Sequence, residues 1–195
     1  MSKKPDYNLA TNKAYETLKL YYGSFPKINV YEIIRSCPDI RLHPYTEVAN
    51  RFNLSYFDFL RHVESDHGFT IYNKTKNVWI ICYNNFKDEY TLRFTLAHEL
   101  GHVVLKHEED NEIARCEADC FARNLLCPVP LREGLGIKTV SDYCNCFGIS
   151  EHMASITKEY ESNDSYYITK ENYNMVNQNI YGYFLGYTPK YLYGI

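Results

Sequence analysis

Apolar residues recur at two different spacings along the chain, which separates predicted helices from predicted strands. Spacings of three and four residues predict helices over Tyr7–Tyr22 and Val30–Ser36. Between Phe69 and Tyr83, β-branched and aromatic residues predominate in two runs that flank a polar segment. This pattern predicts a β-hairpin with strands Phe69–Tyr72 and Asn77–Tyr83.

The same patterns predict four more helices, one helical turn and one short strand. An apolar stripe with three- and four-residue spacing predicts a helix over Glu89–His107. A second long helix is predicted over Glu112–Leu126, and Pro128 stops it because proline cannot continue a helix. The remaining predicted elements are a strand at Ile40–Tyr45, a helical turn at Tyr45–Asn50 and two helices at Thr139–Phe147 and Ser150–Glu161.

The predicted elements indicate a mainly helical α+β fold with a small β-sheet beside the helix at Glu89–His107. We expect an N-terminal helical segment that packs on the core (1–44), a core (45–130), a helix-turn-helix-like packing segment (131–165) and a Tyr-rich tail (166–195). The tail is expected to pack against the chain itself. Acidic residues outnumber basic ones in the third segment, and a DNA reader needs cations that face phosphates. The sequence therefore disfavours contact with DNA.

Composition and charge narrow the class of protein further. Hydrophobic residues make up 45% and charged residues 23% of the chain, as in globular proteins. A net charge of −3 disfavours a protein that covers nucleic acid or an anionic membrane. The N-terminus has no secretory signal, no apolar run is long enough to span a membrane, and the seven cysteines are scattered. We therefore expect a cytoplasmic protein with reduced thiols and no membrane partner.

The chemistry is indicated by His98-Glu99-Leu100-Gly101-His102 on the predicted helix. Residues four apart lie one turn above each other, so both imidazoles can point at one ion. Glu99 flanks that ion without binding it and can take a proton from water. A catalytic zinc also needs a third protein ligand and an open position. The motif therefore predicts His98 and His102 as metal ligands and Glu99 as the catalytic base.

The third ligand is left open by spacing alone. The candidates are His107, Glu112, Glu117 and Asp119. The pattern that uses a third histidine places it six residues after the second one, where this chain has Glu108, so His107 is disfavoured. A hairpin of two helices would bring a carboxylate back to the metal and slightly favours Glu117 over Asp119. Asp119 could instead hold a ligating imidazole by its other nitrogen.

Two motifs resemble those of the ImmA/IrrE family of metallopeptidases. They are Arg93–His102 and Glu117–Pro128, and the resemblance is clear over Trp79–Pro130. It implies a compact, thermolysin-like zincin core and Glu117 as the third ligand. It also implies a sheet whose edge strand, expected at Val78–Tyr83, could pair with an extended substrate.

The resemblance further implies a function. Members typically cleave a helix-turn-helix repressor in a phage or mobile element, so we expect one Zn²⁺ ion and a repressor-type protein substrate. Two other classes stay open: a non-catalytic zinc-containing interaction module, and a direct transcriptional regulator. Manganese or iron also suits two histidines and a carboxylate. The residue that stabilises the oxyanion is unassigned, with Tyr90 and Arg93 near the motif.

Overall fold

The computed structural model describes residues 4–20 and 27–184, and side chains as far as residue 178. The chain forms two compact units. The first unit comprises Met1–Pro5 and Asn29–Ala122, and the second comprises Asp6–Ile28 and Arg123–Ile195. The four segments expected from the sequence stay a prediction. The fold class is confirmed, because the described chain is mainly helical with one small sheet.

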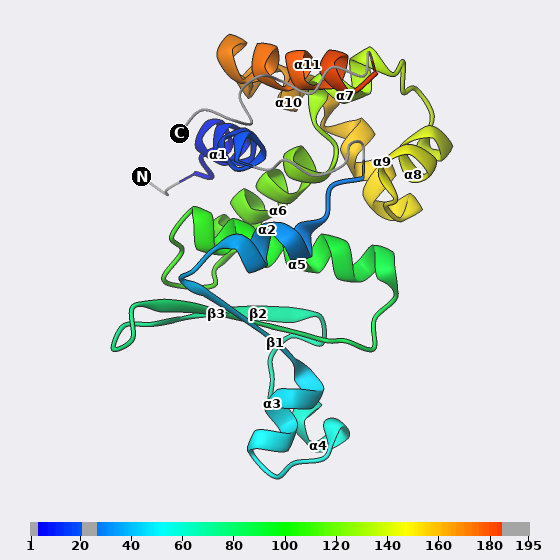
Figure 1. The fold of residues 1–195 in the computed structure, drawn as a ribbon. Helices are drawn as coiled ribbons and strands as arrows, with labels where there is room; N and C mark the ends of the chain where they lie inside the picture. The colour runs from blue at the N-terminus through cyan, green and yellow to red at the C-terminus, as the bar shows by residue number, and fades with distance from the viewer. Residues whose placement is uncertain (1–3, 21–26, 185–195) are drawn as a thin grey trace. The chain divides into compact units, whose positions relative to one another are not determined.

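The sheet of the first unit has three strands in the order β1-β3-β2. Strands β2 (Gly68–Asn73) and β3 (Val78–Tyr83) form the predicted antiparallel hairpin, and β1 (Ile40–Pro44) pairs with β3 in parallel (Figure 1). The expectation that Val78–Tyr83 is an edge strand is therefore wrong. A hairpin pattern gives no information on which side of it a distant third strand pairs, and β1 adds to the β3 side.

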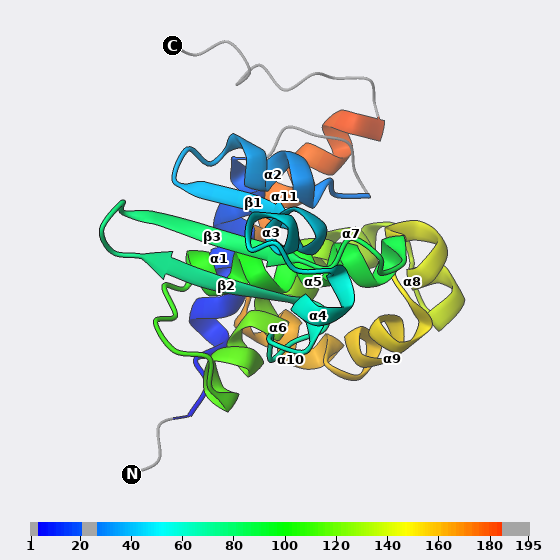
Figure 2. The ribbon, with the colours of Figure 1, turned by 90° about the horizontal axis from the view of Figure 1, so that it is seen from below.

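Helices lie on both faces of this sheet (Figures 1 and 2). On one face, α5 (Glu89–Val104) packs against β2 and β3, with α2 (Val30–Ser36) beside it. On the other face lie α3 (Tyr45–Arg51) and α4 (Tyr56–Leu60). These two helices share a small apolar core with the sheet, formed by Tyr45, Ala49, Phe59 and Cys82.

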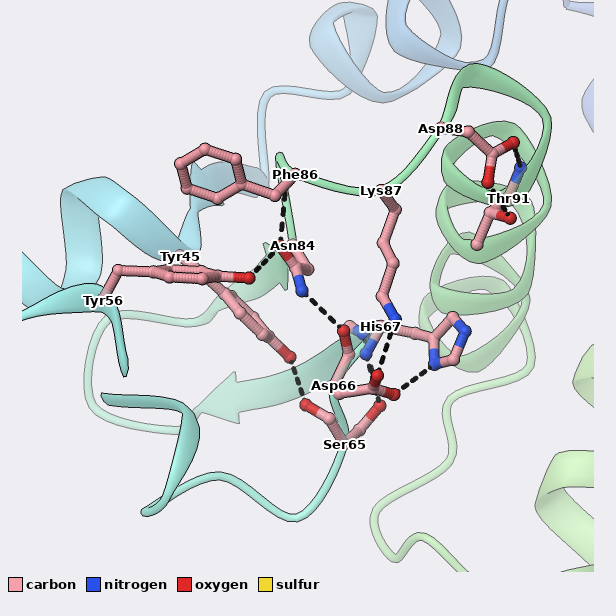
Figure 3. A network of polar contacts seen from close by, with 11 residues as sticks. Tyr45, Tyr56, Ser65, Asp66, His67, Asn84, Phe86, Lys87, Asp88 and Thr91 are labelled. Carbon is pink, nitrogen blue, oxygen red and sulfur yellow. Dashed lines mark hydrogen bonds and ion pairs between the residues drawn. The ribbon is translucent and has the colours of Figure 1, made fainter. Parts of the chain in front are cut away.

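A polar network fixes the points where β2 and α5 begin (Figure 3). The side chain of the buried Asn84 donates to the carbonyl of Asp66 over 2.8 Å, and its oxygen accepts from Tyr56 over 2.9 Å. Tyr45 donates to the carbonyl of Ser65 over 2.8 Å. The segment before β2 is thereby tied to the segment after β3.

The helix α5 begins and ends at identifiable residues. Asp88 accepts hydrogen bonds from the backbone of Tyr90 and Thr91, both over 3.0 Å, and so caps the N-terminus. The helix ends at Val104, three residues earlier than predicted, because Lys106 takes a left-handed conformation with φ of 57°. The backbone N–H of His107 then donates to the carbonyl of His102 over 3.0 Å.

The helix α6 (Glu112–Leu126) contributes residues to both units, since the division falls after Ala122. Where the structure describes it, the second unit is otherwise built of helices. Its other helices are α1 (Tyr7–Lys19), α7 (Val129–Gly134), α8 (Val140–Phe147), α9 (Glu151–Glu159), α10 (Glu161–Tyr167) and α11 (Lys170–Phe184). The last two predicted residues of the first helix lie outside the described residues. None of the helices in the described ranges could cross a membrane.

A buried ionic cluster joins three segments of the second unit. Asp164 on α10 is 1% exposed and accepts from Arg123 over 2.8 and 2.9 Å. It also accepts from Arg132 on α7 over 3.0 Å and from Asn124 over 3.1 Å. Two buried guanidinium groups therefore share one buried carboxylate.

Candidate metal centre

The helix α5 brings the two predicted imidazoles together. His98 and His102 lie one turn apart, and their Nε2 atoms are 3.0 Å from each other. The side chain of Asp119 on α6 lies behind His98, with its Oδ1 2.7 Å from His98 Nδ1. Because an ionised carboxylate only accepts, His98 Nδ1 carries a proton and donates it to Asp119. The Nε2 atom of His98 is thereby directed towards His102.

The two Nε2 atoms fit a divalent cation. Two nitrogens that bind one tetrahedral zinc at about 2.0–2.1 Å lie about 3.3 Å from each other, close to the 3.0 Å found here. At that distance one ring nitrogen donates a hydrogen bond to the other, so the two nitrogens point at a common space. Neutral imidazole nitrogens are also among the commonest zinc ligands. His98 and His102 are therefore suited to hold the metal.

The predicted third ligand, Glu117, lies in the same region but beside another residue. Its Oε2 is 2.9 Å from Nε2 of His107, whose Nδ1 is 3.1 Å from Nδ1 of His102. The remaining candidate, Glu112, is exposed at the start of α6. Among the residues that the structure describes, no three His, Cys, Asp or Glu side chains converge as a complete ligand set. The assignment of Glu117 stays a prediction.

Glu99 lies against the sheet and is only 6% exposed. The hydroxyl of Thr70 on β2 donates to its Oε2 over 2.7 Å. Burial raises the pKa of Glu99, while the charge of His98 and the hydrogen bond from Thr70 oppose that rise. A carboxylate whose pKa is raised towards neutrality is a stronger base than one exposed to water. The environment of Glu99 therefore suits proton transfer.

Two glycines allow the close packing that builds this region. A Cβ atom at Gly68 would lie 2.7 Å from Cγ2 of Thr95, so only glycine lets β2 approach α5 this closely. A Cβ atom at Gly101 would lie 3.1 Å from both Cα of Ala118 and the ring of Phe121. Gly101 therefore lets α6 lie near α5, which brings Glu117 and Asp119 to the histidines.

The two histidines of the motif have opposite electrostatic environments. Burial, together with the charges of His98 and His107, lowers the pKa of His102 to about 3. Burial would also lower the pKa of His98, but the hydrogen bond and charge of Asp119 outweigh it, so that pKa is raised. His102 is therefore neutral at pH 7 and presents a lone pair, which metal binding requires.

Thr70 was not found from the sequence. It lies 29 positions from Glu99 in the chain, and no local pattern marks a strand threonine as the partner of a helix glutamate. The bridging position of His107 was also missed, because its spacing from the motif marks it only as a possible ligand. Tyr90 is 50% exposed near the start of α5, two turns before His98, and the oxyanion role stays unassigned.

Comparison with known families relates this region to peptidases. Residues 51–129 match the model of a peptidase family, so this part of the chain is similar to a peptidase domain. The family is M78, and the matching model describes the IrrE N-terminal-like domain. The resemblance to the ImmA/IrrE family is therefore confirmed, over a segment that contains the His-Glu-x-x-His motif, Glu117 and Asp119. No curated protein matches the chain.

Proposed function

We propose that this chain is a zinc-dependent endopeptidase that cleaves a protein substrate, specifically a repressor-type regulator. The observation that carries the proposal is the 3.0 Å approach of the two Nε2 atoms of His98 and His102 next to the buried carboxylate of Glu99. A structural zinc site has no use for a buried base beside its ligands, so this arrangement favours catalysis over a passive interaction module.

The residues have distinct roles in this proposal. His98, His102 and Glu117 hold one Zn²⁺ ion, which when bound acts as a Lewis acid for peptide hydrolysis. Asp119 orients His98 through its Nδ1 proton. Glu99 accepts a proton from the attacking water at Oε1, because Oε2 is already held by Thr70. Glu99 then returns that proton to the leaving amine.

The substrate is expected to bind along β2. This strand is at the edge of the sheet, and its Thr70 contacts the catalytic base. An extended peptide could add to such an edge through backbone hydrogen bonds. The central strand β3 has no free edge, so the pairing that we expected there is proposed for β2 instead.

The test combines metal analysis with cleavage of a proteome-derived peptide library. We expect purified protein to bind one zinc ion per chain and to generate new peptide N-termini, detected by mass spectrometry. Removal of zinc with a chelator should stop cleavage, and added zinc should restore it. The variant His102→Ala should neither bind zinc tightly nor cleave. A wild-type protein that holds no zinc would contradict the proposal.

The role of Thr70 can be tested separately. Replacing Thr70 by Val removes the hydrogen bond to Glu99 but keeps the side-chain shape. Without this hydrogen bond the carboxylate of Glu99 is no longer held in one orientation, and because a misplaced catalytic group loses rate, we expect kcat to fall about tenfold or more. Zinc content should not change, and Thr70→Ser should recover most of the rate on the same peptides. Equal rates for the Val and Ser variants would refute this role.

A further inference from the structure

We propose that His107 is a positioning residue of the metal centre, which fixes the ring of His102 and links it to the carboxylate of Glu117. The inference rests on the metal site proposed above. Its basis is a continuous chain of contacts: His107 Nδ1 lies 3.1 Å from His102 Nδ1, and His107 Nε2 lies 2.9 Å from Glu117 Oε2. One imidazole thus joins two proposed ligands from different helices.

The end of α5 is shaped to put His107 there. Lys106 adopts a left-handed backbone conformation, with φ of 57°, which residues other than glycine or asparagine rarely take. This turn reverses the chain, and the backbone N–H of His107 bonds to the carbonyl of His102. The rings of the two histidines then meet edge to face, with centroids 5.0 Å from each other and planes at 77°.

The proton positions along the series His102, His107 and Glu117 are mutually consistent. When His102 binds an ion through Nε2, its proton is on Nδ1 and is donated to Nδ1 of His107. Since Nδ1 of His107 accepts that hydrogen bond, the proton of His107 is on Nε2, from which it is donated to the carboxylate of Glu117. Every donor along this series of contacts therefore meets an acceptor. The hydrogen bond to His107 selects the tautomer of His102 that exposes Nε2 to the ion.

The same geometry argues against His107 as a ligand itself. Its ring lies on the Nδ1 side of His102, whereas the ion would lie on the Nε2 side, near His98. The hydrogen bond to His107 does not prevent Glu117 from binding the ion. A carboxylate has about four lone-pair positions, so it can accept from His107 and bind a metal together.

The link through His107 is more deeply buried than the equivalent one behind His98. The side chains of His107 and Glu117 are 11% and 12% exposed, whereas Asp119 is 51% exposed. Hydrogen bonds away from water are less screened, and they restrict side-chain motion more. His107 should therefore have at least as large an effect on metal affinity as other groups that orient metal ligands.

The experiment measures zinc affinity by competition with a chelator in His107→Phe, which keeps a ring but has no nitrogen atoms. We expect affinity to fall about 10–100-fold, the range typical of residues that orient metal ligands. A role in packing alone predicts that the Phe variant binds zinc as the wild type does. The matched control is His62→Phe on an exposed histidine, which should leave zinc affinity unchanged. Affinity of His107→Phe within threefold of the wild type would overturn the inference.

A second measurement needs no variant and covers the case in which His107→Phe does not fold. In zinc-loaded wild-type protein, long-range ¹⁵N NMR correlations should place the proton of His102 on Nδ1 and that of His107 on Nε2. A proton on Nδ1 of His107 would overturn the inference. Failure of the proposed function looks different, because then the wild type itself binds no zinc or His102→Ala binds it equally well.

Discussion

Replacing Glu99 by Gln is expected to lower kcat for peptide hydrolysis by about 10²–10⁴-fold while one zinc ion stays bound. Glutamine keeps the size of the side chain and can still accept the hydrogen bond from Thr70, which is 2.7 Å long in the native protein. It cannot take a proton from water at neutral pH. The loss should therefore fall on kcat, with KM changed only slightly.

A matched control for this variant is Glu108→Gln, which makes the same chemical change on an exposed residue of the loop after α5. Its cleavage rate should equal that of the wild type. Comparing Glu99→Gln with Glu108→Gln also distinguishes the proposed enzyme from an interaction module, because a module would keep its full binding function in Glu99→Gln. More than a tenth of the wild-type rate in Glu99→Gln would rule out Glu99 as the base.

Replacing Asp164 by Ala is expected to cost about 3–5 kcal/mol of folding free energy. The change removes the only carboxylate among the contacts described for this cluster, to which the buried cations of Arg123 and Arg132 both bond. At about 2–4 °C per kcal/mol for a chain of this size, the thermal midpoint should fall by roughly 6–20 °C. Circular dichroism during heating measures that midpoint.

The control for Asp164 is Glu16→Ala in the same unit. Glu16 forms an exposed pair with Lys13 on α1, and such pairs contribute about 0–1 kcal/mol. Its thermal midpoint should therefore lie within a few degrees of the wild type. If Asp164→Ala unfolds at the same temperature as Glu16→Ala, the cluster does not stabilise the second unit.

Regular local patterns made much of the fold predictable from the sequence. The helices Val30–Ser36 and Glu112–Leu126 have their predicted bounds, and the hairpin is placed within one residue at each end. Short helices were missed where the pattern is too brief to show a period, as in Tyr56–Leu60. The helix Val129–Gly134 was missed because Pro128 and Pro130 indicated a stop, yet proline is also well suited to the first turn of a new helix.

In the candidate site too, features set by residues close in sequence could be predicted, whereas features set by distant residues could not. The approach of His98 to His102 follows from the helical period and could be read from the sequence. The contacts from Thr70, Asp119 and His107 depend on how β2, α6 and the end of α5 pack. Packing at this precision rests on Gly68 and Gly101, whose role becomes visible only when the neighbouring atoms are known.

The parallel pairing of β1 with β3 has a consequence for the order of folding. Only a short turn separates the strands β2 and β3, so their pairing closes a short loop. Ile40 must instead meet Trp79 across a long intervening segment, which costs more chain entropy. Such nonlocal contacts form more slowly. The hairpin, whose strand β2 carries Thr70, is therefore expected to form early in folding, before the third strand completes the sheet.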